Sequence, residues 1–473
     1  MAYFSNITEV VSKVNSIEFD SRRVVEGGLF VAIRGAQSDG HRFIAAAEAK
    51  GAKVVVCEEL PEVQSSEVEY IVVDDSHSAL AYLAAQFYDN PSTKLKLVGI
   101  TGTNGKTTTA TLLYNLFKKL GYAVGLLSTV ENRIDGEVVP STHTTPDPVE
   151  LNALLSRMVA AGCEYCFMEV SSHAMVQKRA LALEFAGGVF TNLTHDHLDY
   201  HKTFANYLSA KKSFFDTLPK SAFALTNLDD RNGEVMLQNC AAKKCGYSLR
   251  RLSDYHTIVL EEHLDGTLLR INDKELWVRL IGRFNAYNIS AIYGSAMELG
   301  QGSDQVLSAL SELCSVDGRF ETFRSDDGRL AIVDYAHTPD ALSNVLSTIN
   351  DICQGVQVIT VVGCAGDRDK DKRPVMARIA ASNSTRVILT SDNPRSEDPS
   401  VILQEMVDAL SGEQLRRTLV IENREQAIAA AAAFAGKGDV ILIAGKGHEK
   451  YQETKGVRTH FDDCEVIRKA FSI

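Results

Sequence analysis

The run LVGITGTNGKTTT at residues 97–109 constrains the fold more than any other stretch of this chain. Its apolar start predicts a buried parallel strand, and Gly102 and Gly105 allow a tight turn after it. A helix is expected to open at Lys106 and to end at Gly121, with an inner face made by Leu112, Leu113, Leu116, Phe117 and Leu120. Such a strand, turn and helix N-terminus form an anion cradle, because backbone N–H groups and the helix dipole both favour negative charge there.

The same turn carries the residues of a nucleotide site. Its pattern G-x-x-G-K-T is a shortened variant of G-x-x-x-x-G-K-[ST], in which the lysine reaches the outer phosphates and the hydroxyl ligates Mg²⁺. The longer pattern would require a glycine where this chain has Ile100. A glycine turn with one lysine can be purely structural, but the strand before it and the helix after it favour nucleotide phosphate.

Bulk properties bound the class of protein. At roughly 150 residues per domain, the 473 residues correspond to about three domains, and the net charge of −12 argues against a general nucleic-acid or anionic-membrane surface. The chain shows no apolar run approaching the ~20 residues of a membrane-spanning helix and no secretory signal at its start. Nine scattered cysteines fit a reducing compartment, so we expect a cytoplasmic protein. The lone C-x-x-C at Cys163 and Cys166 favours strand packing over zinc.

Short apolar runs alternate with helical patterns, which predicts an α/β protein in three domains. We expect a small α/β domain over residues 1–91, a central P-loop domain with a mostly parallel sheet over residues 92–317, and a Rossmann-like α/β domain over residues 318–473. Asn90-Pro91-Ser92 is interpreted as a linker. Strands are expected at residues 29–33, 54–56, 70–73, 124–130, 166–170, 188–193, 223–227, 330–335, 356–362, 387–390, 419–421 and 440–444.

Three local signals refine this outline. The apolar period changes to two near residues 257–280, which predicts an antiparallel flap. Thr338-Pro339 suits the N-cap and first position of a helix. The last domain resembles a dinucleotide-binding domain, but Gly445-Lys446-Gly447 lacks the third glycine, so we do not assign that fingerprint.

Polar residues gather at the ends of two further strands of the central domain. Glu169 ends the run CFMEV, and His197 lies in TNLTHDHLDYH. Because ligands bind outside the carboxyl ends of strands in open α/β sheets, these side chains are expected to hold a metal beside the phosphate cradle. Either residue alone would more often be structural. Mg²⁺ is favoured over zinc, because the clustered Cys and His spacing of zinc sites is missing.

Ten motifs occur in order along the chain: TGTNGKTTT, MEVSSH, TNLTHDHLDYH, SAKKSFF, GRFNAYN, DGRFETF, VDYAHTPDAL, GDRDKDKRP, DNPR and AGKGHE. Together they resemble the Mur ligase family, the ATP-dependent ligases of peptidoglycan precursor synthesis, over essentially the whole chain. The resemblance is greatest to the member that adds meso-2,6-diaminopimelate to UDP-N-acetylmuramoyl-L-alanyl-D-glutamate. It implies these two substrates, ATP as co-substrate, two Mg²⁺ ions, a UDP-binding first domain and an amino-acid-binding last domain. Separately from the resemblance, we expect a monomer.

The resemblance also implies residue roles at the nucleotide. ATP would contact Gly102, Thr103, Asn104, Gly105, Lys106, Thr107, Thr108, Asn285, Asn288, Arg319, Asp334 and His337. Catalysis would involve Lys106, Glu169, His197 and Lys211, and the metal ligands would be Thr107, Glu169, His197 and Lys211. Lys211 matches the lysine that this family carboxylates on its side-chain nitrogen. That modification replaces a cation, of pKa about 10.4, with an anion that can coordinate Mg²⁺; without the resemblance, a solvated surface lysine would be favoured.

The other substrates would be held by three groups of residues. The uridine diphosphate would contact Ser21, Gln37 and Ser38, and the muramoyl-peptide end would contact Thr144, Thr145, Ser171, Gln177 and Arg179. Diaminopimelate would contact Arg368, Asp392, Asn393, Arg395, Gly445 and Glu449. A guanidinium such as that of Arg395 can clamp the extra carboxylate that separates diaminopimelate from lysine. Some relatives have a histidine at the position of Ala36, so that contact does not transfer.

The implied reaction activates the γ-carboxylate of D-glutamate as an acyl phosphate, which an amine of diaminopimelate then attacks. No serine or cysteine nucleophile is required, and closure of the domains about Pro91 and Val316 is expected. Two related enzymes are alternatives, a ligase adding another residue such as L-lysine and a folylpolyglutamate synthetase. An alternative of another class is a P-loop switch or transport ATPase, which would hydrolyse ATP without any amino acid.

Overall fold

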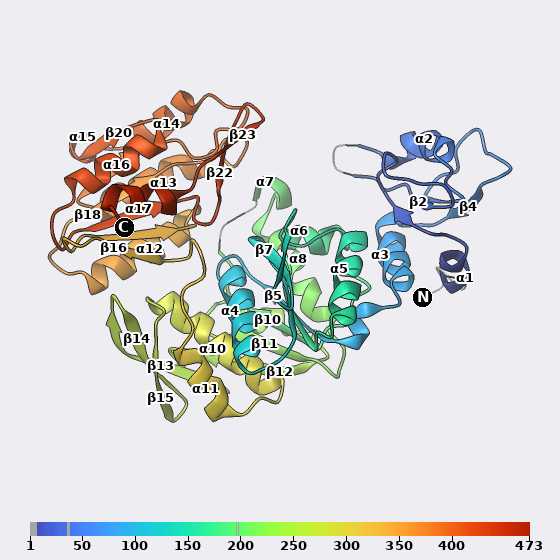
Figure 1. The fold of residues 1–473 in the computed structure, drawn as a ribbon, viewed down its shortest axis with the longest axis horizontal. Helices are drawn as coiled ribbons and strands as arrows, with labels where there is room; N and C mark the ends of the chain where they lie inside the picture. Colours follow the sequence, from blue (N-terminus) through green and yellow to red (C-terminus); the bar gives the residue numbers. More distant parts are fainter. Residues whose placement is uncertain (1–6, 36–37, 195, 197) are drawn as a thin grey trace.

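Three open sheets, each covered by helices, follow one another along the chain in the computed structural model (Figure 1). The structure describes residues 7–35, 38–194, 196 and 198–473. Three residues discussed above, Ala36, Gln37 and His197, therefore lie outside the described residues. The fold is α/β, as expected from the alternation of apolar runs and helical patterns.

The first sheet has four parallel strands in the order β1-β2-β3-β4. They are β1 (Ile17–Glu18), β2 (Leu29–Val31), β3 (Val54–Cys57) and β4 (Glu69–Val72). Its helices are α1 (Ile7–Ser12), α2 (Ile44–Ala49) and α3 (Ser76–Phe87), with a 3₁₀ turn, η1 (Gly40–Phe43). All residues of β2 and β3 are buried, as continuous apolar runs predict for strands covered on both faces.

The expected linker at Asn90-Pro91-Ser92 is packed against the protein rather than exposed as a free connection. Residues Pro91–Lys94 form a 3₁₀ turn, η2, in which Pro91 and Ser92 are buried. The Ser92 hydroxyl accepts a hydrogen bond from the Glu184 backbone N–H at 3.0 Å. A proline beside small polar residues correctly indicates the segment between two sheets. Its burial and its bond to Glu184 hold this segment against the central domain.

The central sheet has eleven strands in the order β15-β14-β13-β12-β11-β10-β5-β9-β6-β7-β8. Their bounds are β5 (Lys96–Thr101), β6 (Val124–Leu127), β7 (Glu131–Ile134), β8 (Glu137–Pro140), β9 (Tyr165–Glu169), β10 (Gly187–Phe190), β11 (Phe223–Asn227), β12 (Lys243–Ser248), β13 (Tyr255–His263), β14 (Gly266–Ile271) and β15 (Lys274–Val278). Neighbouring strands pair in parallel along the run β6-β9-β5-β10-β11-β12-β13. Strands β13, β14 and β15 form the expected antiparallel flap.

The other edge of this sheet differs from the prediction. A single strand was expected at residues 124–130, whereas β6 ends at Leu127 and an antiparallel hairpin, β7-β8, follows. The hairpin turns at Asp135 and Gly136, whose φ angles are 44° and 103°. Asp-Gly between short alternating segments is a hairpin signal, so the cue was present in the sequence.

Helices cover both faces of the central sheet. Helices α4 (Lys106–Lys119), α10 (Arg283–Glu298) and α11 (Ser303–Ser311) share one apolar core, and α5 (Pro148–Ala160) and α8 (Phe204–Asp216) share the other. The short helices are α6 (Ser172–Val176), α7 (Leu198–His201) and α9 (Gly233–Met236). The predicted inner face of α4 is confirmed by four buried residues, Leu112, Leu113, Leu116 and Phe117, while Leu120 is partly buried.

The last sheet has six strands in the order β16-β17-β21-β18-β19-β20, parallel except for β16. They are β16 (Glu321–Arg324), β17 (Leu330–Asp334), β18 (Val358–Val362), β19 (Arg386–Leu389), β20 (Thr418–Val420) and β21 (Val440–Ala444), and a separate hairpin joins β22 (Tyr451–Thr454) to β23 (Val457–His460). Its helices are α12 (Pro339–Ile352), α13 (Lys372–Asn383), α14 (Pro399–Val407), α15 (Gly412–Leu415), α16 (Arg424–Phe434) and α17 (Asp463–Phe471). The Thr338 hydroxyl caps α12, as predicted.

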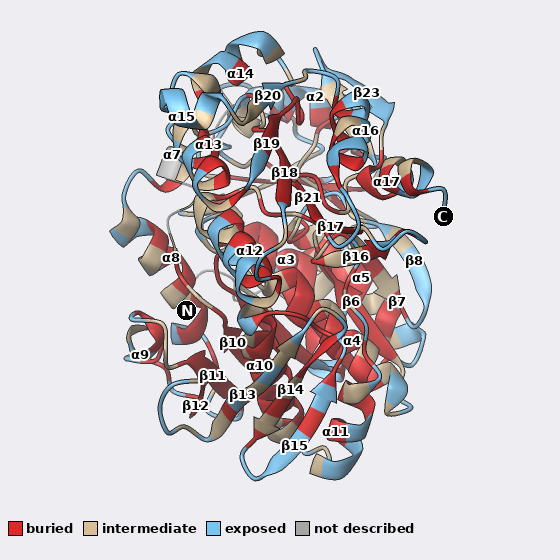
Figure 2. Cartoon of the chain, turned by 90° about the vertical axis from the view of Figure 1, so that its left-hand side faces the viewer, coloured by how far each residue is buried: buried red, intermediate tan, exposed pale blue. Residues whose placement is uncertain are grey.

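Burial follows this layering, since the inner strands are buried while helix faces and loops are exposed (Figure 2). The central sheet lies between the first sheet and the last sheet (Figure 1). Within the described residues, the structure has no helix with the length and apolar character needed to cross a membrane. The domain limits at residues 91 and 317 remain a prediction.

Candidate active site

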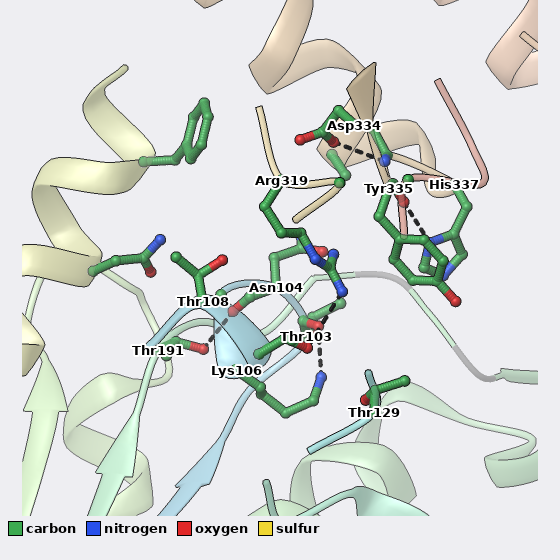
Figure 3. Close-up of a pocket in the computed structure, with 18 of the residues that line it drawn as sticks. Thr103, Asn104, Lys106, Thr108, Thr129, Thr191, Arg319, Asp334, Tyr335 and His337 are labelled. Carbon is green, nitrogen blue, oxygen red and sulfur yellow. Dashed lines mark hydrogen bonds between the residues drawn. The ribbon is translucent and has the colours of Figure 1, made fainter. Parts of the chain in front are cut away.

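A cleft of about 1720 Å³ lies where the last sheet faces the carboxyl ends of the central strands. Most of the predicted nucleotide residues line it, namely Thr103, Asn104, Gly105, Lys106, Thr107, Thr108, Asn285, Asn288, Arg319, Asp334 and His337. In Figure 3, Arg319, Tyr335 and His337 of the last domain face the loop that carries Asn104 and Lys106. Two parts of the chain more than 200 residues apart therefore form one site.

The glycine turn is held in shape by its neighbours. A Cβ atom added to Gly102 would lie 1.9 Å from the Thr191 Oγ1 atom, so only glycine fits at that position. The Thr191 hydroxyl donates to the Asn104 carbonyl at 2.6 Å, and the Asn192 side-chain oxygen accepts from the Asn104 N–H at 2.9 Å. Thr191 and Asn192 were not predicted, although both belong to the TNLTHDHLDYH motif; they brace the loop that would hold phosphate.

Two cations converge on this loop. The Lys106 ammonium donates to the carbonyls of Gly102 and Thr103 at 3.0 and 2.9 Å, and burial lowers its pKa. The Arg319 guanidinium donates to the Thr107 hydroxyl at 3.3 Å and lies 4.4 Å from the Tyr335 ring centroid. The N-terminus of α4 adds its dipole to both charges. The arrangement can therefore bind a polyphosphate.

Asp334 and His337 shape the loop that follows β17. The Asp334 carboxylate accepts from the backbone N–H groups of Phe320 and Ala336 at 2.7 and 2.8 Å, and burial raises its pKa. His337 Nδ1 lies 2.8 Å from the Tyr335 carbonyl, and burial lowers the pKa of His337 to about 4, so the ring is neutral at pH 7. Asp334 thus fixes the backbone on either side of its strand end, next to Arg319, and both Arg319 and the neutral His337 ring line the cleft.

Glu169, at the end of β9, has one carboxylate oxygen to offer. Its Oε1 atom accepts from the Thr129 N–H at 2.8 Å, whereas its Oε2 atom is buried and has no hydrogen-bond partner in the part of the chain that the structure describes. A carboxylate oxygen of this kind suits a hard cation such as Mg²⁺. The described residues contain no group of three His, Cys, Asp or Glu side chains placed to hold a metal, so Glu169 needs ligands of other kinds.

Lys211 is a buried residue of α8 rather than a solvated surface lysine. Its side chain is 1% exposed, and its Nζ atom donates to the Gly102 carbonyl at 2.7 Å. Burial, and then the nearby Lys106 charge, lower its pKa well below the usual value. A neutral lysine nitrogen beside the phosphate loop is the form that can react with carbon dioxide.

The residues expected at the muramoyl-peptide end cluster beside Glu169. The Thr145 hydroxyl donates to the Glu169 carbonyl at 2.8 Å, and the Arg179 guanidinium donates to the Thr145 carbonyl at 2.6 Å and to the Gln177 side-chain oxygen at 2.7 Å. Thr144 and Ser171 line the same wall. These five residues come from two segments, residues 144–145 and residues 171–179, which hydrogen bonds join.

The two described residues expected for uridine diphosphate, Ser21 and Ser38, lie outside this cleft. Ser21 lies in a turn after β1, and Ser38 lies in a loop between β2 and η1. The reason is the arrangement of the domains, since α3 of the first domain packs beside α5, away from the last sheet (Figure 1).

The expected amino-acid residues divide into a lining group and a supporting group. Arg368, Arg395 and Glu449 line the cleft, whereas Asp392 and Asn393 are buried behind it. Gly445 supports the same wall, because a Cβ atom there would lie 2.7 Å from an Asp392 carboxylate oxygen.

Arg395 has an uncommon backbone conformation, with a φ angle of 52°. Its N–H donates to the Glu453 carbonyl at 3.0 Å, and its guanidinium donates to the Gly366 carbonyl at 3.1 Å. Burial raises the pKa of Glu449, and the neighbouring Asp392 raises it further. A cationic group and an anionic group therefore face one end of the cleft.

Besides Thr191 and Asn192, sequence reasoning missed Tyr335, His448 and Lys446. Tyr335 lies between the rings of His337 and His448, with centroid distances of 4.5 and 4.8 Å. Lys446 is fully buried beside Glu449. All lie in the VDYAHTPDAL and AGKGHE motifs, so their motifs were noticed but their side chains were not assigned.

Three family models match the chain. "Mur ligase family, catalytic domain" matches residues 13–88, "Mur ligase middle domain" matches residues 100–296, and "Mur ligase, glutamate ligase domain" matches residues 318–447. Two curated relatives are both named UDP-N-acetylmuramoyl-L-alanyl-D-glutamate--2,6-diaminopimelate ligase. The protein from Parabacteroides distasonis is 58% identical, over 97% of this chain and 95% of the relative, and that from Clostridium botulinum is 41% identical, over 98% and 97%.

Solved structures agree with these matches. A structure with the same ligase name has a TM-score of 0.69 at 33% identity, covering 97% of this chain and 95% of the other. MurF ligase from Thermotoga maritima, in complex with ADP, has a TM-score of 0.64 at 21% identity, covering 99% and 98%, and shows likeness of fold alone.

Proposed function

The chain belongs to the Mur ligase family and is an ATP-dependent amide ligase, and we propose that it adds meso-diaminopimelate to the D-glutamate of UDP-N-acetylmuramoyl-L-alanyl-D-glutamate. One observation carries the choice of substrates. A phosphate loop and an amino-acid end bearing Arg368, Arg395 and Glu449 open into one cleft. An amino acid with two carboxylates and two ammonium groups matches the charges at that end.

A carboxylate is a poor acyl donor at neutral pH, so the γ-carboxylate must first be activated. It attacks the terminal phosphorus of ATP, the bond to ADP breaks, and an acyl phosphate forms. An amine of diaminopimelate then attacks the acyl carbon, and phosphate leaves from the tetrahedral intermediate. The positions of Lys106, Arg319 and the α4 N-terminus support this route, because they face the place where charge develops.

We propose that Thr107, Glu169, His197 and a carboxylated Lys211 hold two Mg²⁺ ions. The buried Glu169 oxygen without a hydrogen-bond partner in the described chain supports this site, as does the position of the Thr107 hydroxyl on the phosphate loop. Bound Mg²⁺ would neutralise charge on the phosphates during transfer. Burial favours the neutral Lys211 amine, which adds carbon dioxide to give a carbamate and a proton.

The remaining substrate contacts are proposed by position. Ser21, Gln37 and Ser38 would hold the uridine diphosphate on the first domain, with Thr144, Thr145, Ser171, Gln177 and Arg179 at the peptide end. Because Ser21 and Ser38 lie away from the cleft, the proposal requires the long substrate to bridge two domains. All nine cysteines are free, which supports a reducing, cytoplasmic setting; we further propose that the enzyme works as a monomer.

The test is phosphate release from ATP by the full chain, with UDP-N-acetylmuramoyl-L-alanyl-D-glutamate present and amino acids supplied one at a time. We expect release that requires both the nucleotide substrate and meso-diaminopimelate, with a new amide product by mass spectrometry. If phosphate release is faster with L-lysine than with meso-diaminopimelate, the proposed amino acid is wrong and the chain is a related ligase that adds L-lysine. Release unchanged when both acceptor and amine are omitted would favour a P-loop ATPase and refute the proposal.

A further inference from the structure

Lys446 is a buried cation directly behind the amino-acid end of the cleft. Its side chain is 0% exposed. The flanking Gly445 and Gly447 have φ angles of 117° and 51°. A Cβ atom on Gly447 would lie 2.6 Å from the Gly318 carbonyl oxygen, so the chain turns here only with glycine. The two glycines thus direct Lys446 into the interior.

The Lys446 ammonium is engaged by protein groups. It donates to the Asn393 side-chain oxygen and to Glu449 Oε2, both at 3.1 Å, and lies 5.4 Å from the Tyr451 ring centroid. A lysine ammonium has three donors, and a buried one is costly unless paired. These contacts direct its charge toward Asn393 and Glu449.

Glu449 is held on one side by these contacts. Its Oε2 atom accepts from both Lys446 and the Asn393 amide nitrogen, the latter at 2.7 Å. The Asn393 oxygen also accepts from the Glu453 N–H at 2.9 Å, so the amide cannot turn freely. No described residue is recorded as a hydrogen-bond partner of Glu449 Oε1, and Glu449 lines the cleft.

We propose that Lys446 is a positioning residue for the amino-acid substrate, which holds Oε2 of Glu449 so that Oε1 is presented to a substrate ammonium group. This inference rests on the proposed function and names how the same site recognises the end of its amino acid. Asn393 acts in the same unit, since its amide joins Lys446 to Glu449.

Removing the Lys446 charge changes the electrostatics of Glu449. Besides Lys446, the charged or titratable groups that interact with Glu449 are Asp392, Tyr335, Tyr451, Arg424 and Arg458. Burial and Asp392 already raise the pKa of Glu449, and Lys446 opposes that rise. Without Lys446 the carboxylate takes up a proton closer to neutral pH, and a protonated carboxyl binds an ammonium group poorly.

The test compares Lys446→Met, Lys446→Gln, Glu449→Gln and the double variant Lys446→Met/Glu449→Gln with the wild type. Steady-state phosphate release is measured while diaminopimelate and ATP are varied in turn, at pH 6.5 and pH 8.5. Because a hydrogen bond to a charged group is among the stronger ones, we expect Lys446→Met to raise the KM for diaminopimelate about tenfold at pH 6.5 and less at pH 8.5. The KM for ATP should not change.

Three further comparisons separate positioning from a structural role. The double variant should have the same KM for diaminopimelate as Glu449→Gln alone, since Lys446 acts through Glu449. Lys437→Met, on an exposed loop outside the cleft, is the matched control and should behave as the wild type. Lys446→Gln keeps a donor without the charge and should give an intermediate KM.

The inference is overturned by an unchanged KM for diaminopimelate in Lys446→Met, or by effects of the two single variants that multiply in the double. Loss of the folded state in both Lys446 variants, measured by thermal melting, would assign Lys446 to stability and also overturn it. A wild type whose phosphate release ignores diaminopimelate would instead refute the proposed function itself.

Discussion

Replacing Arg395 by alanine tests the choice of diaminopimelate most directly. The substitution removes the guanidinium but leaves the loop attached, because the main chain of Arg395 accepts from the Lys455 N–H at 2.5 Å and donates to the Glu453 carbonyl at 3.0 Å. Arginine and alanine pay a similar cost for a φ angle of 52°, so the backbone should not relax. The perturbation is therefore confined to the side chain.

The size of the effect follows from what the guanidinium can bind. Among the described residues, the Arg395 guanidinium donates one hydrogen bond, to the Gly366 carbonyl. Most of its N–H donors therefore remain for a ligand. Losing one partner of a buried charge pair costs about 2–5 kcal/mol, and the partial exposure of Arg395 favours the lower end. At 1.36 kcal/mol per factor of ten, about 2 kcal/mol corresponds to roughly a 30-fold rise in KM.

The assay is phosphate release with saturating UDP-N-acetylmuramoyl-L-alanyl-D-glutamate, in which diaminopimelate and ATP are varied separately. The KM for diaminopimelate should rise by roughly 30-fold, with little change for ATP, and the preference over L-lysine should narrow. Arg378→Ala, at an exposed position of α13, is the matched control. Equal increases in both KM values, or no increase, would remove Arg395 as the residue that selects the amino acid.

Three further predictions concern other parts of the molecule. Lys211→Ala should nearly abolish ligation, with partial rescue by bicarbonate or short carboxylic acids; turnover like the wild type would contradict a carbamate. Asp463→Ala leaves the fully buried Arg424, which it holds through two 2.7 Å contacts, without its carboxylate. Urea unfolding should then show a free energy of unfolding lower by about 3–5 kcal/mol, and a loss under about 1 kcal/mol would refute this. Arg373 lowers the pKa of Glu397 from its usual 4.5 to about 2, so the pair stabilises the fold above about pH 4.5 and is lost as the pH falls toward 2. The wild type should therefore lose more stability than Glu397→Gln between about pH 5 and about pH 3, and parallel losses would contradict the pairing.

Much of the fold could be predicted because its signals are local. The glycine turn after β5, the apolar face of α4 and the Thr338 cap of α12 depend on residues close in sequence. The β7-β8 hairpin was missed although its Asp135-Gly136 turn is also local, because each strand has only four residues and β8 is mostly exposed, so neither forms an apolar run. Residues at the carboxyl ends of strands, such as Glu169, could be proposed because parallel strands end at one edge.

Other features depend on packing between distant segments. The sequence does not show that Lys211 is buried beside the phosphate loop. Lys211 and Lys212 are adjacent lysines of one helix, and nothing in the sequence distinguishes a lysine that contacts water from one that donates to a backbone carbonyl. Lys446 and Asn393, which are 53 residues apart, meet because β19 and β21 flank β18 in parallel, so the segments that follow them leave the same edge of the sheet.

By itself the sequence determined the α/β class, the phosphate loop and the family, because each rests on spacing within short motifs. The tertiary structure decided which side chains are buried, which of them meet across domains, and that the expected uridine contacts Ser21 and Ser38 lie apart from the main cleft. The physical reason is that burial and charge pairing depend on three-dimensional neighbours, and those neighbours come from segments far apart in the chain.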